Sequence, residues 1–375
     1  MSIEIRKVES RKELRQFIHL PAAIHSGEKN FLPPIYADDW NFFDSKKNVS
    51  FASCDTILVL AWHNGKPVGR VMGIIHNKYN QLHNEKNARF GYLDCYNDRE
   101  ISDALIGFIE NWALDHGMEK VIGPYGFSDK DVQGLLVEGF EHMPILDSAC
   151  NPPYIVELLK QKGYTKEVDC MIYRFPLTDE LPQLYYRIIQ RSNHRNEYQI
   201  LEFATKKQLK PYIFPVLKLV NETYDELFGF VPMTDEDIQE FVDRYMSIID
   251  PRFVKIAVKE GVIIGFIVGL PNFTRGIQQS KGYLFPVGIF QILWAQKHTR
   301  QLDLMLGAVK REFQGLGLEV AMGLSIVESA RKAGMEFIEV HLILETNRRM
   351  QAEMERLNLP VHKRFRVFQK SLPSK

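Results

Sequence analysis

The segment VKREFQGLGLE, residues 309–319, combines residue types that can hold an anion through the backbone. Gly315 and Gly317 stand where an apolar, strand-like run gives way to a long amphipathic helix. The first turn of a helix has unpaired N–H groups and carries the positive end of the helix dipole, so it attracts phosphate. Glycine lets that backbone approach a ligand closely because it has no Cβ atom. The segment predicts either a phosphate site or a turn that the glycines merely ease.

A second set of reactive side chains lies in FIEVHLILE, residues 337–345. Strict alternation along a strand places Glu339, His341 and Glu345 on one face. His341 is the residue type that accepts a proton near neutral pH, and either glutamate could do so if burial raised its pKa. We expect a general base for an amine among these three residues. The alternative is that they lie at a wet end of the sheet or make structural hydrogen bonds.

An internal repeat indicates which elements position these residues. Two segments share one pattern, a pair of strands joined by a tight turn and followed by a second glycine. They are TILVLAWHNGKPVGRVMGIIH (56–76), with its turn at Asn64-Gly65 and its glycine at Gly69, and RFVKIAVKEGVIIGFIVGLPN (252–272), with its turn at Glu260-Gly261 and its glycine at Gly265.

Each hairpin is followed by the same series of elements. A third strand is expected at 89–96 and at 301–309, then a helix at 101–112 and at 318–333, and then a strand that follows the words HGME and AGME. This order predicts a mixed α/β sheet in each half. We therefore expect an N-terminal domain at 1–177, a connecting helix at 178–195 and a C-terminal domain at 196–375.

The glycine segment resembles the pyrophosphate loop of the GNAT (Gcn5-related N-acetyltransferase) superfamily, whose pattern is Gln/Arg-x-x-Gly-x-Gly/Ala after a strand that ends in valine. Gln314 and Gly317 fit the pattern, and Asn347 matches the asparagine that begins a helix of the family's cofactor site. Phrases such as GKPVGR and NPPYIVELLKQKGY resemble a bacterial group of tandem-GNAT proteins. The resemblance implies two tandem GNAT-like acyl-CoA N-acyltransferase folds. It implies that acetyl-CoA or another acyl-CoA binds at Ala308, Val309, Gln314, Gly315, Leu316, Gly317, Leu318 and Asn347.

Two residues depart from the family pattern. Glu319 replaces a small residue and brings a negative charge towards the expected pyrophosphate. Met354 stands where many relatives have the tyrosine that protonates the departing thiolate. In the family, backbone N–H groups on the third strand meet the thioester carbonyl, which here implies the stretch around Gly307, Ala308 and Val309.

The first half lacks the glycines at the corresponding place. Asn97 and Glu100 have the spacing of a capping box, which would satisfy the free N–H groups of the helix with side chains. Asp98, Glu100 and Asp103 also place negative charge where phosphates would lie. We expect the first copy to bind no cofactor and to support the second.

Composition excludes several classes. The chain has 375 residues, with 47 Lys plus Arg against 47 Asp plus Glu, so it lacks the basic excess of a nucleic-acid binder. No run has the length of a membrane span or the pattern of a signal peptide, so we expect a cytoplasmic protein without membrane contact. The four cysteines lack metal-ligand spacing and are expected as reduced thiols. Histidines without paired spacing predict no metal site.

The function expected is transfer of an acetyl or other acyl group from acyl-CoA to an amine of a small molecule or peptide. Glu222, Asp225 and Glu226 could attract the amine, although a solvated helix face explains them equally well. The alternative is a catalytically inactive GNAT-like protein that binds a ligand or partner. Aminoacyl transfer from tRNA is disfavoured by the neutral charge. The aromatic insertion at 273–300 predicts packing between the halves, with a lid, an acceptor pocket or a homodimer contact as alternatives.

Overall fold

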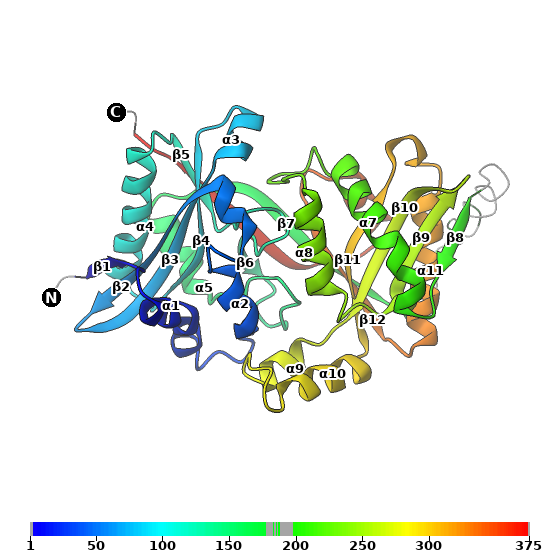
Figure 1. Ribbon diagram of the computed structural model, residues 1–375, viewed down its shortest axis with the longest axis horizontal. Coiled ribbons are helices and arrows are strands. Elements are labelled where there is room, and N and C mark those ends of the chain that lie inside the picture. Colours follow the sequence, from blue (N-terminus) through cyan, green and yellow to red (C-terminus); the bar gives the residue numbers. More distant parts are fainter. Residues whose placement is uncertain (1–2, 178–182, 184, 186, 188–197, 374–375) are drawn as a thin grey trace. The chain divides into compact units, whose positions relative to one another are not determined.

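A computed structural model describes residues 3–177, 183, 185, 187 and 198–373. The chain forms two compact units (Figure 1). Unit 1 contains residues 1–171, 273–295 and 363–375, and unit 2 contains residues 172–272 and 296–362. Segments 273–295 and 363–375 thus belong to the first unit rather than to the predicted 196–375 range. The predicted connecting helix at 178–195 lies almost entirely outside the described residues, so that division stays a prediction.

Unit 1 is built on a mixed sheet with the strand order β1-β2-β3-β4-β5-β13 (Figure 1). Only the β4–β5 pair in this series is parallel, and β6 pairs with β13. The strands are β1 (Glu4–Lys7), β2 (Cys54–His63), β3 (Lys66–His76), β4 (Asn87–Cys95), β5 (Lys120–Gly123), β6 (Leu135–Glu138) and β13 (Val361–Ser371). Strand β7 (Thr165–Pro176) contributes its residues up to Met171 to this unit.

Helices cover both faces of this sheet. On one face α4 and α5 enclose a core with Val71, Phe90 and Leu105, and on the other α1 and α2 enclose a core with Phe17 and Met72. The helices are α1 (Arg11–Ile24), α2 (Tyr36–Phe42), α3 (Asn77–His83), α4 (Arg99–Asp115), α5 (Pro153–Gln161), α9 (Thr274–Gln279) and α10 (Gly288–His298), with a 3-10 turn at Val49–Ser53. The last three residues of α10 are assigned to unit 2.

Unit 2 repeats the plan. Its strands follow the order β12-β11-β10-β9-β8, and only β11 and β12 run parallel. Helices α7 and α8 pack on one face, and α11 packs on the other. The elements are β8 (Gln199–Glu202), α7 (Lys206–Thr223), α8 (Asp235–Tyr245), β9 (Val254–Lys259), β10 (Val262–Pro271), β11 (Gln301–Val309), α11 (Leu318–Lys332), β12 (Phe337–Leu344) and α12 (Arg348–Arg356), with 3-10 turns at Pro251–Phe253 and Arg311–Phe313.

The expected duplication is visible in the local geometry. Both hairpin turns have two residues with positive φ, at Asn64-Gly65 and at Glu260-Gly261, which is the geometry that matches strand twist. In both units the third strand shifts register against the second, between Arg70 and Met72 and between Val268 and Gly269. The repeated glycine has a packing role. A Cβ on Gly69 would lie 2.8 Å from Leu105 of α4, and one on Gly265 would lie 3.1 Å from Met322 of α11.

The start of α4 corrects one prediction. The N-cap is Asp98, whose side chain accepts a hydrogen bond from the Glu100 N–H, so Asn97 does not form the expected capping box. The helix begins at Arg99, one residue later than Asn97 would place it. A carboxylate of the chain itself occupies this helix start.

The cysteines are free thiols, and Cys54, Cys95 and Cys170 are buried. Burial raises the pKa of Cys54 to about 11 and that of Cys95 to about 12. The Cys54 and Cys95 thiols therefore stay protonated near neutral pH and pack as small apolar groups.

Candidate active site

Strands β11 and β12 separate halfway along their length in unit 2. Their parallel pairing runs from Gln301↔Phe337 to Leu304↔Val340 and stops there. Strand β11 continues to Val309 paired only with β10. Its backbone edge beyond Leu304 is therefore not paired with β12, and side chains contact it instead. This separation is the geometry in which a third strand can present N–H groups to a bound acyl carbonyl.

The hydroxyl of Tyr224 lies at that edge. It donates to the carbonyl oxygen of Gly307 at 3.0 Å, and the Gly307 N–H points to the same hydroxyl at 3.4 Å. Tyr224 caps the C-terminus of α7 and is half-buried. Sequence reasoning did not select it, although it lies within the acidic segment 221–232. The only signal in the sequence was that Glu222, Asp225 and Glu226, close to Tyr224, were expected to attract the amine.

The predicted base His341 follows Val340, the last residue of β12 that pairs with β11. It is half-buried at the point where the strands part. The predicted alternation ends at the next residue, because Leu342 has φ of 22° and both Ile343 and Leu344 are buried. Glu345 lies beyond the strand and is half-buried. The expectation that Glu339, His341 and Glu345 share one regular face is therefore wrong.

Glu339 lies in a buried ion pair with Arg174. Its side chain is fully buried, Arg174 donates to its Oε1 at 2.5 and 3.1 Å, and His362 Nε2 lies 3.3 Å from the same oxygen. The guanidinium hydrogen bonds occupy this carboxylate oxygen and hold the side chain in place. We therefore assign the binding of Arg174, rather than catalysis, to Glu339.

The predicted loop adopts the backbone that the glycines allow. Gly315 and Gly317 have φ of 74° and 90°, the left-handed region. Gly317 is the N-cap of α11 and gives it no side-chain cap, in contrast to Asp98 in unit 1. Leu316 is exposed and Leu318 is buried. The first turn of α11 thus presents backbone N–H groups rather than side chains.

One acid of the chain reaches this loop. The Glu319 carboxylate accepts a hydrogen bond from the Gly315 N–H at 2.9 Å. A carboxylate there occupies the kind of position that a phosphate oxygen would take. The side chain is exposed, so it can turn towards solvent without losing packing. The departure noted in the sequence therefore has a direct structural counterpart.

The second predicted cofactor element lies next to the loop. Gln314 donates from Nε2 to the Val309 carbonyl at 2.9 Å, and Arg349 of α12 donates to Gln314 Oε1. Asn347 caps α12 by accepting from the Met350 N–H at 3.2 Å. Met354, where the family has a tyrosine, is buried. The structure thus brings the loop and the Asn347 helix together.

The acids expected to attract an amine are partly engaged. Arg311 binds Asp225 at 2.6 Å and Glu226 at 3.1 Å, and Lys310 lies 3.9 Å from Glu222. These ion pairs link the loop to the end of α7, where Tyr224 is located. Because the pairs are mostly exposed, they are weak and can yield to a polyanion.

These features form one series in unit 2. The β11 edge at Gly307 and Val309, the cations Lys310 and Arg311 and the start of α11 follow one another along the chain, and Arg349 of α12 contacts Gln314 in the same loop. Ala308 faces β10 through its backbone, since it pairs with Phe266. No group of three His, Cys, Asp or Glu side chains in the described part of the chain is placed to hold a metal ion.

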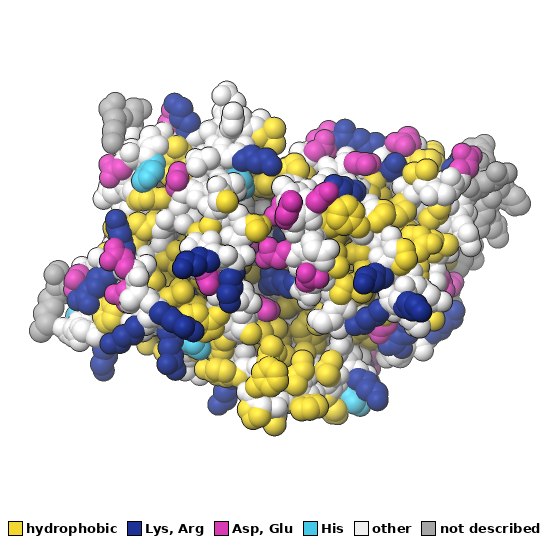
Figure 2. All heavy atoms as spheres, in the orientation of Figure 1, with side chains coloured by type: hydrophobic (Ala, Val, Ile, Leu, Met, Phe, Trp, Pro, Cys, Tyr) yellow, Lys and Arg dark blue, Asp and Glu magenta, His cyan; other side chains and the backbone are white. Residues whose placement is uncertain are grey.

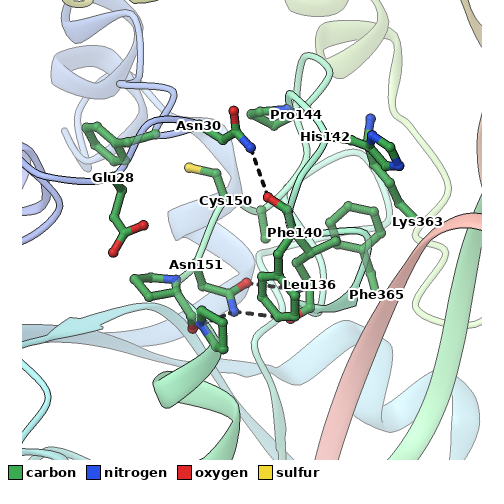
Figure 3. A pocket seen from close by; sticks show the side chains of 14 residues that line it. Glu28, Asn30, Leu136, Phe140, His142, Pro144, Cys150, Asn151, Lys363 and Phe365 are labelled. Carbon is green, nitrogen blue, oxygen red and sulfur yellow. Dashed lines mark hydrogen bonds between the residues drawn. The ribbon is translucent and has the colours of Figure 1, made fainter.

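A separate cavity of about 60 Å³ lies in unit 1, beside the start of α5 (Figure 3). Its wall includes Asn151, whose amide is held by both backbone groups of Leu136, and Cys150, whose thiol contacts the Leu32 carbonyl. Burial raises the pKa of Cys150 to about 12. The cavity is well below the 300 Å³ or so of an ordinary ligand pocket. It therefore offers no second site for a CoA ester.

Comparisons with known proteins support the fold. No protein-family model matches the chain. It is 27% identical to protein YghO of Escherichia coli K12 over 389 residues, covering 98% of this chain and 95% of YghO. It is 26% identical to a bacterial ceramide synthase of Caulobacter vibrioides over 377 residues, covering 99% and 98% of the two chains.

Two solved structures match along nearly their whole length. A tandem GNAT protein from the clavulanic acid biosynthesis pathway superposes with a TM-score of 0.56 at 13% identity, covering 100% of both chains. A GCN5-related N-acetyltransferase from Sphaerobacter thermophilus gives 0.53 at 14% identity, covering 99% and 96%. The expected fold class is confirmed: this chain has the tandem fold of the GCN5-related N-acetyltransferases.

Proposed function

We propose that this protein is an N-acyltransferase that moves an acyl group from acyl-CoA to an amine, with the donor held by unit 2. The observation that carries the proposal is the continuous series of groups from the freed edge of β11 to the uncapped start of α11. It provides backbone donors for an acyl carbonyl and for a diphosphate in the order in which they occur in an acyl-CoA. A cytoplasmic location is part of the proposal.

The reaction needs one base, one set of carbonyl donors and one acid. The acceptor nitrogen attacks the thioester carbon, the C–S bond breaks, and the CoA thiolate leaves. The nitrogen becomes positively charged when the neutral amine attacks, and its proton goes to His341, directly or through water. The Gly307 N–H supports the carbonyl oxygen of the tetrahedral intermediate. The Tyr224 hydroxyl, which hydrogen-bonds to Gly307, gives its proton to the thiolate.

The relatives suggest the class of acceptor. A ceramide is an amide of a long acyl chain with an amino alcohol, and the chain resembles a bacterial ceramide synthase over nearly its full length. We propose a long-chain amino alcohol as the acceptor and a fatty acyl-CoA as the donor. Small polyamines and peptides are the comparison acceptors, assayed by release of CoA thiol.

Binding of the donor is tested by thermal unfolding with acetyl-CoA, palmitoyl-CoA and free CoA. A CoA species present at 100 times its Kd is expected to add about 2.7 kcal/mol to the free energy of unfolding. Leu316→Glu should abolish this gain, because it places a charge in the loop without requiring positive φ. The matched control is Leu82→Glu, because Leu82 is also an exposed leucine but lies on α3, away from the loop. Equal stabilisation of both variants would contradict a ligand at this loop.

Glu319→Gln tests the acid in the loop. Removal of a negative charge beside a diphosphate is expected to lower the KM for acyl-CoA roughly tenfold, consistent with about 1–4 kcal/mol for charges 4 Å apart. The kcat value should change little, because the carboxylate is far from the thioester along the donor. The check is steady-state kinetics at low and high salt, since screening should shrink the difference. A KM that rises in the variant would mean that Glu319 assists binding.

The same contact favours a second candidate function, a catalytically inactive protein that binds another ligand or partner. The Glu319 carboxylate already satisfies the Gly315 N–H, and Met354 replaces the family's tyrosine. This candidate requires that no CoA species stabilises either the original protein or Glu319→Gln. Turnover with any amine would exclude it.

A further inference from the structure

The segment that contains α9 and α10 presents an exposed apolar surface in unit 1. The side chains of Phe285, Phe290 and Trp294 are 81%, 68% and 60% exposed. Tyr283, Val287 and Leu293 are also exposed, and we call these six residues the α9–α10 surface. Figure 2 shows the hydrophobic side chains gathered over these two helices, at the lower edge of the view. The expectation that this insertion packs between the halves stays a prediction.

This surface is built on a well-packed support. A Cβ on Gly276 would lie 2.6 Å from the Ile292 Cα, so the backbones of α9 and α10 pack closely against each other here. The Gly282 carbonyl accepts from the Tyr36 N–H at 3.1 Å, and Gln278 donates to the carbonyls of Lys29 and Phe31. Ile277 and Ile292 are buried beneath the surface. The exposed aromatics are therefore presented by a fixed scaffold rather than by a loose loop.

The charged residues within the α9–α10 stretch itself have one sign. Between Phe273 and Leu302 the chain has no aspartate or glutamate, although acids and bases balance over the whole protein. The basic residues next to the exposed aromatics are Arg275 and Lys281, with Lys297 near the end of α10, all of them exposed, whereas Arg300 is paired with Glu336. Tyrosine and tryptophan beside basic residues are typical of a surface that lies in the headgroup region of a bilayer. A protein partner of mixed charge would not explain the complete lack of acids.

We propose that the α9–α10 surface docks on the headgroup region of a membrane that contains anionic lipid. The aromatic side chains enter the acyl boundary, and the lysines and arginines bind the anionic headgroups. No described helix is both long and apolar enough to cross a bilayer. That finding concerns spanning and does not bear on docking, so the sequence-based expectation of no membrane contact is replaced here by a proposal of peripheral binding. The inference does not depend on the proposed acyl transfer.

The experiment is sedimentation of the 375-residue protein with vesicles of phosphatidylcholine that contain about 30% phosphatidylglycerol, at about 0.1 M salt. Phe285→Ser, Phe290→Ser and Trp294→Ser combined should lower the partition coefficient by roughly a thousandfold, since burial of each such side chain contributes about tenfold. Arg275→Gln with Lys281→Gln should lower it several-fold and reduce its salt dependence. Vesicles of phosphatidylcholine alone should bind at least about tenfold more weakly.

The matched control is Leu82→Ser with Val262→Ser, two exposed apolar residues away from α9 and α10, which should bind vesicles like the original protein. Thermal unfolding checks that each variant is folded. Equal vesicle binding by the aromatic variant would overturn the proposal. A second result would also overturn it: the original protein fails to bind vesicles, and analytical ultracentrifugation shows a dimer that the aromatic substitutions dissociate. CoA binding is measured on the same variants. Unchanged CoA binding would show that the loss of vesicle binding does not arise at the proposed donor site.

Discussion

Tyr224→Phe is expected to lower kcat roughly 100- to 10,000-fold, the range for loss of a positioned proton donor. The hydroxyl lies 3.0 Å from the Gly307 carbonyl oxygen, on the part of β11 that has left β12. Met354 stands where many relatives have the proton-donating tyrosine, and its side chain has no acidic proton. The KM for acyl-CoA should change little, because the loop and α11 hold the diphosphate. Stopped assays of amide formation measure both constants.

The pH profile separates an acid from a structural hydroxyl. An acid must be protonated, so the activity of the original protein should fall on the alkaline side, and Tyr224→Phe should lack that fall. His341→Ala should instead remove the fall on the acidic side, because a base must be unprotonated. Tyr212→Phe, on the same helix and packed on Phe203, is the control. Unchanged kcat and an unchanged profile in Tyr224→Phe would remove the tyrosine from the mechanism.

Asp94→Asn is expected to destabilise unit 1 by about 3–5 kcal/mol, the usual cost of breaking a buried ion pair from one side. Arg70, 5% exposed, donates Nε to Asp94 at 2.8 Å and a terminal nitrogen to the Phe17 carbonyl at 2.8 Å. His25 lies 2.7 Å from the other carboxylate oxygen. The variant leaves a buried guanidinium without its anion. Urea unfolding followed by fluorescence measures the loss.

The same variant should change the acid dependence of stability. Burial alone would raise the pKa of Asp94, but Arg70 and His25 outweigh burial and hold the pKa below its usual value. A lowered carboxyl pKa adds stability above the unfolded pKa of about 3.9, and this stability is lost as the pH falls through the lower folded pKa. The unfolding free energy of Asp94→Asn should therefore fall less steeply in acid. Asp103→Asn, in a more exposed pair with Arg99, should change stability by under about 1 kcal/mol.

The parts of the fold that local pattern determines were predictable. The hairpin turns, the third strands and the helices at 101–112 and 318–333 follow from turn residues and periodicity, and α4 and α11 lie at those places. The N-cap was misplaced by one residue because Asn97 and Asp98 both have capping side chains. Alternation failed at Leu342 because strand regularity there depends on the parting from β11, which no periodicity records.

The candidate site was predictable only where its residues are neighbours in the sequence. Gln314, Gly315 and Gly317 form one loop whose backbone is determined by its glycines. The partners that come from elsewhere were not predictable, because folding alone brings them together. Tyr224 reaches Gly307 from 83 residues away, and Arg174 reaches Glu339 from 165 residues away. Exposure of the 283–294 aromatics likewise depends on packing that apolar composition does not reveal.

The position of β13 affects how the protein is made. Residues 368–371 pair with 120–123, so the last strand of the chain supplies the neighbour of β5. A ribosome therefore releases the first half of the protein with an open β5 edge, and that edge stays open until β13 has been synthesised. Unpaired strand edges promote aggregation. Loss of β13 would consequently harm the half that was synthesised first.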